Sequence, residues 1–179
     1  EFYDNNHKII NFSQEKFIEI ASSLGYYLKS FSSLDRFLEY ISLVSKYLIS
    51  QDFSIIFPLD ERGELWVDNI FVSGTPDDSE LLMKTSKFCN SSGLLDNFRI
   101  KNIVILEAFL KNSLSSYSFK SYKIISRNKC RGFFYVFNKK PLKKNQIEEV
   151  RNAEFIVNIL AVGIENYLLS KTNKKHENV

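Results

Sequence analysis

The sequence predicts an α+β domain in which helices from both ends of the chain cover a single, mainly antiparallel sheet. Near the start and near the end of the chain, apolar residues recur at three- and four-residue spacing, as they do in amphipathic helices. Between these segments, runs rich in β-branched and aromatic residues follow one another with short turns, which favours antiparallel pairing of the strands. The 179 residues, of which 44% are hydrophobic, suffice for one folded domain with a buried core.

Two amphipathic helices are expected before the sheet. Apolar residues recur at helical spacing from Phe17 to Phe31, and Ser13 stands where an N-cap residue is expected. After a break at residues 32–33, the same spacing resumes over residues 34–48. We therefore expect the second helix to pack beside the first.

The middle of the chain supplies the strands. In "FSIIFPLDERGELWVDNIFVSG", residues 53–74, two apolar runs flank the turn-forming residues 60–63, which predicts a hairpin with Trp66 in its second strand. A short helix is expected at residues 75–93, started by acidic residues and ended by Gly93. Three further strands are expected in "RIKNIVILEAFL", "SSYSFKSYKIIS" and "RGFFYVF".

The last predicted helix begins near Ile147 and continues nearly to the end of the chain. It carries two apolar stripes, so that one stripe can face the sheet and the other a partner helix. One stripe consists of Ala153, Ile156, Leu160, Gly163 and Tyr167. The stripe in heptad register predicts a parallel homodimer seam formed by Val157, Ala161, Ile164 and Leu168. For the part before Ile164, the alternative is a wide apolar face that packs only on the domain's own core.

The charge pattern does not favour a nucleic-acid partner. The formal net charge is only +3, and acidic residues are scattered among the basic ones. The lysines between residues 139 and 144 lie next to Glu148 and Glu149, which favours a solvated turn over a phosphate-binding face. We therefore expect no binding to nucleic acid.

The sequence also bears on compartment and metal binding. No apolar run approaches the roughly 18 to 20 residues that a membrane span needs, and the N-terminus lacks the pattern of a signal peptide. We therefore expect a cytoplasmic protein with no membrane span in this fragment. His7 and His176 lie at the two ends of the chain, so no metal site is expected, and Cys89 and Cys130 lack the CxxC spacing and are expected to be reduced thiols.

The order of these elements and three local patterns resemble a GAF domain, a small ligand-binding module of signalling proteins. In "YLISQDFSIIFPLDERGELWV" a helix leads into a strand that ends in a turn of Leu-Asp-x-x-Gly type, as it does where a GAF domain begins. "SSYSFKSYKIISRNKC" stands where the family has the hairpin ahead of its last strand. "RGFFYVFNKKPLKKNQIEEVRNAEFIVNILAVGIENYLL" is similar to the end of a GAF domain, with a Gly before an apolar strand and a helix that carries Gly163-Ile164-Glu165-Asn166.

The resemblance covers the chain from about Phe17 to Leu169 and implies a five- or six-stranded antiparallel sheet. It implies that the N- and C-terminal helices lie on one face of this sheet and a ligand pocket on the other. We further expect a single domain over residues 13–170, with a flexible lead or a cloning remnant at 1–12 and a linker at 171–179 toward a downstream module. The specific expectation is the N-terminal sensory domain of a cyanobacterial-type sensor histidine kinase, which binds a small molecule or senses redox state and signals through its last helix.

No residue pattern identifies the ligand or a cofactor. Asn138-Lys139 matches the cyclic-nucleotide motif of the family only in part, and neither cysteine is followed by the His common in bilin-binding members. The aromatic candidates for the walls of a small-molecule pocket are Trp66, Phe71, Phe88, Tyr117, Tyr122 and Phe134.

Two alternatives stay open beside a sensor of a small molecule or of redox state. For redox sensing, the candidate residues are Cys89 and Cys130, acting as thiols or through an iron–sulfur cluster shared between protomers. The cationic neighbours of Cys130 keep open a thiol-dependent reductase of the GAF fold. The other alternative is a GAF-like dimerisation or protein-interaction module whose pocket is filled by its own aromatic side chains. We expect no catalytic residue in the domain itself.

Overall fold

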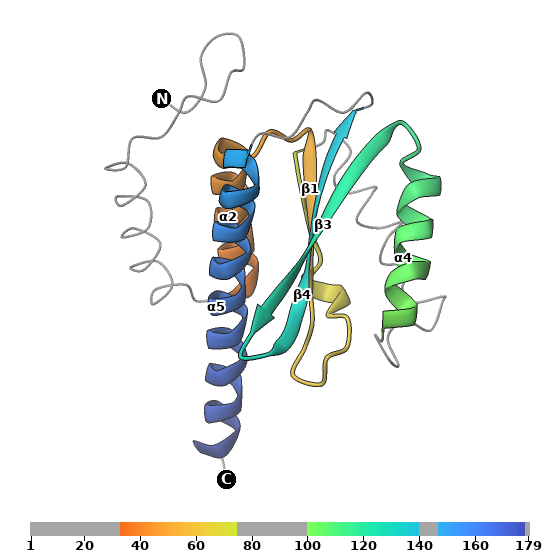
Figure 1. Cartoon of the computed structure of the whole chain (residues 1–179). Helices are drawn as coiled ribbons and strands as arrows, with labels where there is room; N and C mark the ends of the chain where they lie inside the picture. Colours follow the sequence, from red (N-terminus) through yellow and green to blue (C-terminus); the bar gives the residue numbers. More distant parts are fainter. Residues whose placement is uncertain (1–32, 75–99, 140–146, 178–179) are drawn as a thin grey trace, which may run out of the picture.

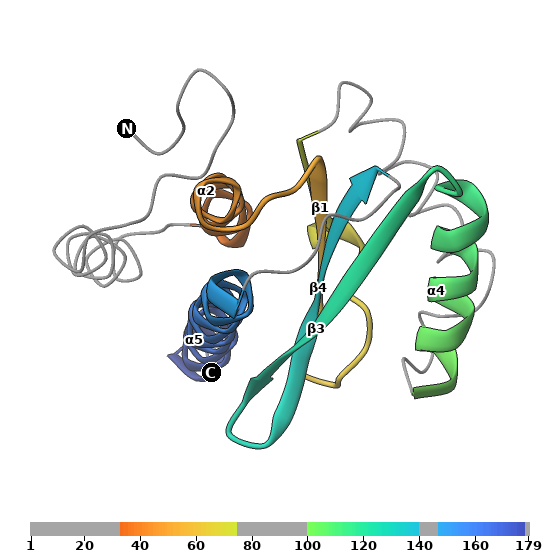
Figure 2. The ribbon, with the colours of Figure 1, turned by 45° about the horizontal axis from the view of Figure 1, so that its top comes forward.

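The protein folds as an antiparallel sheet whose two faces are covered by different helices. The computed structural model describes residues 33–74, 100–139 and 147–177. In chain order the elements are α2 (Leu34–Leu48), β1 (Phe53–Pro58), the 3-10 helix η1 (Val67–Asn69), β2 (Phe71–Ser73), α4 (Ile100–Ser113), β3 (Tyr117–Ser126), β4 (Lys129–Lys139) and α5 (Ile147–Glu177). Helices α2 and α5 lie side by side on one face of the sheet, and α4 lies on the other (Figures 1 and 2). The α+β class and the placement of the C-terminal helix are therefore confirmed, whereas the helices expected at residues 13–31 and 75–93 lie outside the described residues.

The strands lie in the order β2-β1-β4-β3, and every neighbouring pair is antiparallel. The central strands β1 and β4 are buried on both faces, which explains why their sequences are nearly continuous apolar runs. The expectation of five or six strands is wrong for the part of the chain that the structure describes, which forms a four-stranded sheet.

The segment predicted as the first of the three late strands is instead the helix α4. The β-branched residues around Ile103 and Val104 favour a strand, but the continuation Leu-Glu-Ala-Phe-Leu-Lys is rich in strong helix formers. Leu106 and Leu110, one helical turn apart, are both fully buried against the sheet, while Ile105 is exposed. Tertiary packing of this helical face therefore outweighs the local strand preference.

The predicted hairpin is confirmed in its turn but not in its second strand. The carboxylate of Asp60 accepts hydrogen bonds from the backbone N–H groups of Arg62 (2.8 Å) and Glu64 (3.0 Å), and Gly63 adopts a φ of 79°. After an isolated bridge between Leu59 and Leu65, the chain leaves the ladder and returns only at β2. The prediction that Trp66 lies in a strand is therefore wrong, because this residue lies in the β1–β2 loop, residues 59–70, just before η1.

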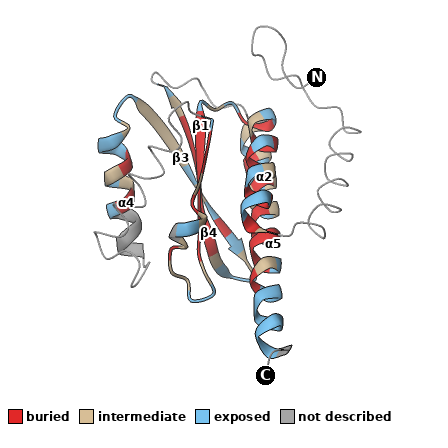
Figure 3. Cartoon of the chain, turned by 180° about the vertical axis from the view of Figure 1, so that it is seen from behind, coloured by how far each residue is buried: buried red, intermediate tan, exposed pale blue. Residues whose placement is uncertain are grey.

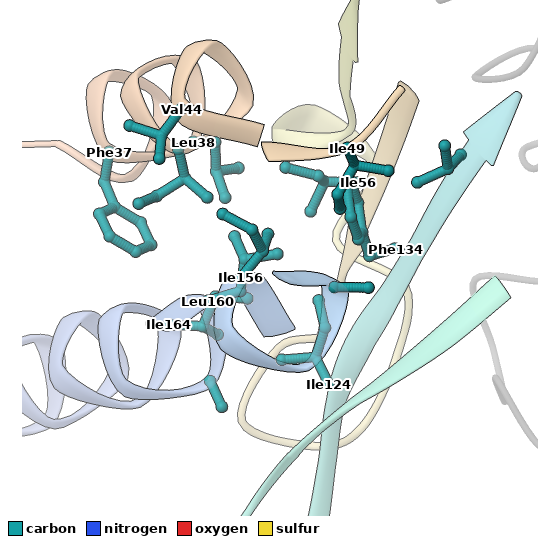
Figure 4. Close-up of a cluster of buried hydrophobic side chains, with 14 of the residues drawn as sticks. Phe37, Leu38, Val44, Ile49, Ile56, Ile124, Phe134, Ile156, Leu160 and Ile164 are labelled. Carbon is teal, nitrogen blue, oxygen red and sulfur yellow. The ribbon is translucent and has the colours of Figure 1, made fainter. Parts of the chain in front are cut away.

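Two apolar clusters form the core, one on each face of the sheet. The first lies between the sheet and helices α2 and α5, and side chains from all three meet there, among them Leu38, Ile56, Phe134 and Leu160 (Figure 4). The second lies under α4 and is rich in aromatic rings. The burial pattern in Figure 3 shows that α5 is buried where it faces the first cluster and exposed toward its C-terminal end.

Helix α5 also contains, within Glu149–His176, an 18-residue stretch whose mean hydropathy of 1.3 meets the criterion for a membrane span. Half of that stretch is buried inside the fold, where its side chains pack on α2 and the sheet. A core helix of a globular domain passes the same test, so composition alone does not place α5 in a membrane. The helix extends to Glu177, so that part of the segment predicted as a linker is helical.

Candidate functional site at the junction of the sheet and the C-terminal helix

A buried ion pair joins the central strand β4 to helix α5. The Nε of Arg131 lies 2.5 Å from Oε2 of Glu165, and Nη2 lies 3.2 Å from Oε1 of the same carboxylate. Each residue is only 9% exposed, so water screens the pair little. The two-pronged geometry fixes both the distance and the orientation of the helix relative to the strand.

A local irregularity of the strand places Arg131 at this junction. Along β3 and β4 the register passes from the pair Ile124–Gly132 to the pair Ile125–Cys130, so Arg131 has no opposite residue on β3. Such a bulge redirects the side chain of the extra residue. Gly132 makes the bulge sterically feasible, because it has a φ of +153° and a Cβ there would lie 2.5 Å from the carbonyl oxygen of Phe57.

The two helices of this face are in contact where Gly163 of α5 faces the ring of Phe37. A Cβ atom on Gly163 would lie 2.0 Å from Cζ of that ring, so the glycine provides the space that the ring fills. At the other end of α2, Nδ2 of Asn152 donates to the carbonyl oxygen of Leu48 (2.8 Å), which satisfies an otherwise unpaired helix-end acceptor. Helix α5 is thus connected to α2 at both ends of their contact.

The face of the sheet under α4 is filled by aromatic side chains. The ring of Phe53 stacks on Phe137 at 4.5 Å and meets Tyr117 edge-on at 4.9 Å, and the ring of Phe57 meets Tyr135 edge-on at 5.4 Å. All of these residues belong to or contact the second cluster. The side chains described on this face therefore pack on one another.

One polar contact crosses this aromatic cluster. Tyr135 is fully buried, and its hydroxyl donates to Oε1 of Glu107 on α4 at 3.3 Å. Burial raises the pKa of the Tyr135 hydroxyl well above its ordinary value of 10.0, and the neighbouring Glu107 carboxylate raises this pKa further. The pKa of Tyr122, on the opposite face, is raised in the same direction by burial and then by Glu149.

Because the pKa of Tyr135 is higher in the folded protein than in the unfolded chain, folding favours the protonated hydroxyl. This stabilisation is fully present below pH 10.0, the ordinary pKa, and is lost as pH rises above it. We expect the free energy of unfolding, measured by urea denaturation at several pH values, to fall above pH 10.0 with a slope of at most about 1.4 kcal/mol per pH unit for this one proton. In Tyr135→Phe, the dependence on pH that is due to Tyr135 is absent, and only the smaller dependence due to Tyr122 remains. Equal slopes of the free energy of unfolding against pH in wild type and variant would contradict the raised pKa of Tyr135.

The residues predicted to bind a ligand fall on different faces of the sheet. Trp66, Phe71 and Tyr122 pack against the first cluster, to which the fully buried Phe134 belongs, so these residues lie on the face that carries α2 and α5. Tyr117 packs against the second cluster, under α4. The structure therefore does not bring them together in one pocket, and Phe88 lies outside the described residues.

The predicted dimer seam is corrected by the structure. Ala161, Ile164 and Leu168 are buried in the first cluster, and Val157 packs against it, so this stripe contacts the domain's own core. For the part of the helix before Ile164, the alternative prediction was that this apolar face packs only on the domain's own core. The structure shows this packing, and it continues beyond Ile164 as far as Leu168.

The second predicted stripe also faces the core, because Ala153, Ile156 and Leu160 are buried in the first cluster and Tyr167 packs against it. Neither predicted stripe is therefore free to form a dimer seam.

The outward side of α5 carries a different row of residues, which we call the outward stripe: Val162, Asn166, Leu169 and Asn173. They recur with the alternating three- and four-residue spacing of a coiled-coil seam. Val162 is 47% exposed and Leu169 43%, and Asn166 and Asn173 are also exposed. Only the docking of α5 on the sheet decides which row of the helix faces outward.

Of the two cysteines, Cys130 is the one that the structure describes. Cys130 is half-buried beside the second cluster, and its Sγ lies 3.5 Å from the carbonyl oxygen of Gly132. The other candidate redox residue, Cys89, lies outside the described residues. In the described part of the chain, no three His, Cys, Asp or Glu side chains gather as metal ligands would.

The residues that join the sheet to α5 were not singled out from the sequence, although the signal was there. Arg131 stands directly before the glycine of the last strand, and Glu165 belongs to the Gly163-Ile164-Glu165-Asn166 stretch. Both segments were noted for their resemblance to the end of a GAF domain. Their pairing across 34 positions of the chain becomes visible only in the structure.

No protein-family model matches the sequence, and no curated protein matches it. Among solved structures, the chain is similar to one described as the GAF domain/HD domain protein from Geobacter sulfurreducens, with 12% sequence identity and a TM-score of 0.48. The similarity covers 79% of this chain and 98% of that chain. At this level of similarity no residue role is carried over, and the contacts of the chain itself are the basis for its function.

Proposed function

We propose that this chain is a GAF-like regulatory domain of a signal-transduction protein and that α5 carries its output. The buried Arg131–Glu165 pair is the observation that favours this function most directly, because it couples a central strand rigidly to the last helix. A change in the sheet would therefore shift α5. From the resemblance alone, the effector that we propose is a cytoplasmic sensor histidine kinase.

What the domain senses has two candidate answers. A small molecule bound on the α4 face would act on the sheet close to Tyr135 and Glu107. The dense packing of aromatic rings on this face favours the second candidate, a dimerisation or protein-interaction module that holds no ligand. A thermal-shift screen with small metabolites separates them, since only the first predicts a ligand that raises the melting temperature, and Glu107→Gln would then weaken that response.

Under either candidate we propose that the protein acts as a parallel homodimer through the outward stripe of α5. The stripe combines apolar layers at Val162 and Leu169 with polar layers at Asn166 and Asn173. Asparagine inside a coiled-coil seam pairs with its counterpart and selects the dimer and its register. A second copy of the same helix satisfies this pattern without any further partner.

We expect Val162→Glu to weaken dimerisation by at least about tenfold, because it places like charges opposite each other across the seam. Sedimentation equilibrium over a range of protein concentrations measures the effect. Ile125→Glu is the matched control, since Ile125 is 52% exposed on β3 and lies outside the stripe. A monomeric wild type, or equal dissociation constants for Val162→Glu and wild type, would contradict the dimer.

A further inference from the structure

The β1–β2 loop reaches across the fold and contacts the C-terminal turns of α5. The rings of Trp66 and Tyr167 lie 5.7 Å apart, and the ammonium group of Lys171, one turn further along α5, lies 4.6 Å from the centre of the Trp66 ring. Two turns from Tyr167, Nζ of Lys175 lies 3.5 Å from Oε1 of Glu61. Three contacts thus follow α5 along one side toward its end.

The loop is itself held in place at two points. Asp60 accepts hydrogen bonds from two backbone N–H groups of the turn, as described above. With its amide oriented so that donors meet acceptors, Asn69 accepts from Nε1 of Trp66 at 2.7 Å and donates to Oδ1 of Asp35 at 3.0 Å. Asp35 belongs to the first turn of α2, so Trp66 is anchored to one helix while its ring contacts the other.

The last turns of α5 that the loop contacts lie beyond the buried clusters of the core. Leu168 is the last residue of the helix that belongs to a buried cluster among the described residues, and every residue from 169 to 176 is exposed. A helix end without tertiary contacts frays, because short isolated helices are marginal in water. The contacts with Trp66 and Glu61 are therefore tertiary interactions that stabilise this end.

We propose that the β1–β2 loop is a clamp that holds the last turns of α5 in helical form and in a fixed direction. When Trp66 leaves Tyr167 and Lys171, these turns lose the contacts with the loop and the helix end beyond Leu168 opens more readily. The loop is thus a regulatory element for the output helix, and its significance for signalling rests on the proposed function of α5.

Hydrogen–deuterium exchange of the full 179-residue chain tests the clamp. Lys171→Gln and Trp66→Ala are each measured in the wild-type and Val162→Glu backgrounds, so that dimerisation cannot supply the protection. We expect the amides of residues 169–176 to exchange about three- to tenfold faster in Lys171→Gln, with a larger effect in Trp66→Ala, while residues 153–165 keep their rates. Lys123→Gln, which removes an exposed positive charge from β3, is the control and leaves exchange unchanged.

The only tryptophan of the protein gives an independent signal. Lys171→Gln removes the cation from the face of Trp66, so the indole emission spectrum shifts in this variant and not in Lys123→Gln. Wild-type exchange at residues 169–176 in both variants, or equally faster exchange along the whole of α5, would overturn the clamp. A monomeric wild type in sedimentation would instead overturn the proposed dimer and leave the clamp intact, so the two failures are distinguishable.

Discussion

Arg131→Ala is expected to lower the free energy of unfolding by about 3 to 5 kcal/mol, the largest effect of any single substitution at the junction. The substitution leaves the Glu165 carboxylate buried, 9% exposed, without its bidentate partner. Removing one member of a buried pair costs much more than the pair contributes as a whole, because the remaining charge stays shielded from water and no longer has an opposite charge beside it. Urea denaturation followed by circular dichroism measures the change.

Two controls separate this effect from a general loss of charge. Lys175→Ala removes the partner of Glu61 in an exposed ion pair and is expected to change the free energy of unfolding by at most about 1 kcal/mol. The double variant Arg131→Met, Glu165→Leu removes both charges and is expected to recover most of the stability lost in Arg131→Ala. If Arg131→Ala and Lys175→Ala had equal effects, the Arg131–Glu165 pair would not be the tie between β4 and α5.

Gly163→Ala is expected to destabilise the protein by about 1 to 3 kcal/mol, although alanine is the better helix former by about 1 kcal/mol. The added methyl group would lie 2.0 Å from Cζ of Phe37, so α2 and α5 must move apart or the buried ring must leave its position. The sign of the effect is therefore set by packing between the helices. Thermal and urea unfolding measure it.

A second variant tests the origin of this cost. In the Phe37→Leu background the smaller side chain leaves room for the methyl group, so Gly163→Ala is expected to cost less there than in the wild type. Asn158→Ala, at an exposed position of the same helix outside the outward stripe, is the control for helix propensity. A stabilising Gly163→Ala in the wild-type background would show that Phe37 does not contact α5 as the structure describes.

The elements that the sequence predicted correctly are those whose local signals agree with their tertiary surroundings. Residues 34–48 have both a helical period and a helix-compatible composition, and they form α2. Residues 117–126 and 129–139 combine strand formers with the tight turn at Arg127 and Asn128, and they form the β3–β4 hairpin. The turn at residues 60–63 was predictable, because the carboxylate of Asp60 accepts hydrogen bonds from backbone N–H groups two and four residues further along the chain.

The errors arose where local signals conflict or are degenerate. In α4, β-branched residues precede a run of helix formers, so the local signals conflict. The segment is helical because the helix buries Leu106 and Leu110 against the sheet. Trp66 is of a residue type that favours strands, but it lies in the β1–β2 loop directly before η1, although its backbone N–H still donates to the carbonyl oxygen of Pro58 at the end of β1 (2.9 Å). The candidate ligand-binding residues were chosen only because they are aromatic. In the structure Tyr117 lies on one face of the sheet, and Trp66, Phe71, Tyr122 and Phe134 lie on the other.

By itself, the sequence determined the α+β class, the helices over residues 34–48 and from Ile147 onward, the late hairpin and the apolar stripes on the last helix, because these depend on periodicity and on interactions within a few residues. Only the tertiary structure decided that both predicted stripes of α5 are buried, that Arg131 meets Glu165, and that Trp66 contacts Tyr167. A period specifies that one face of a helix is apolar but not which neighbour covers it. That choice is made when elements far apart in the chain exclude water from a shared interface, and it depends on the shapes of all of them together.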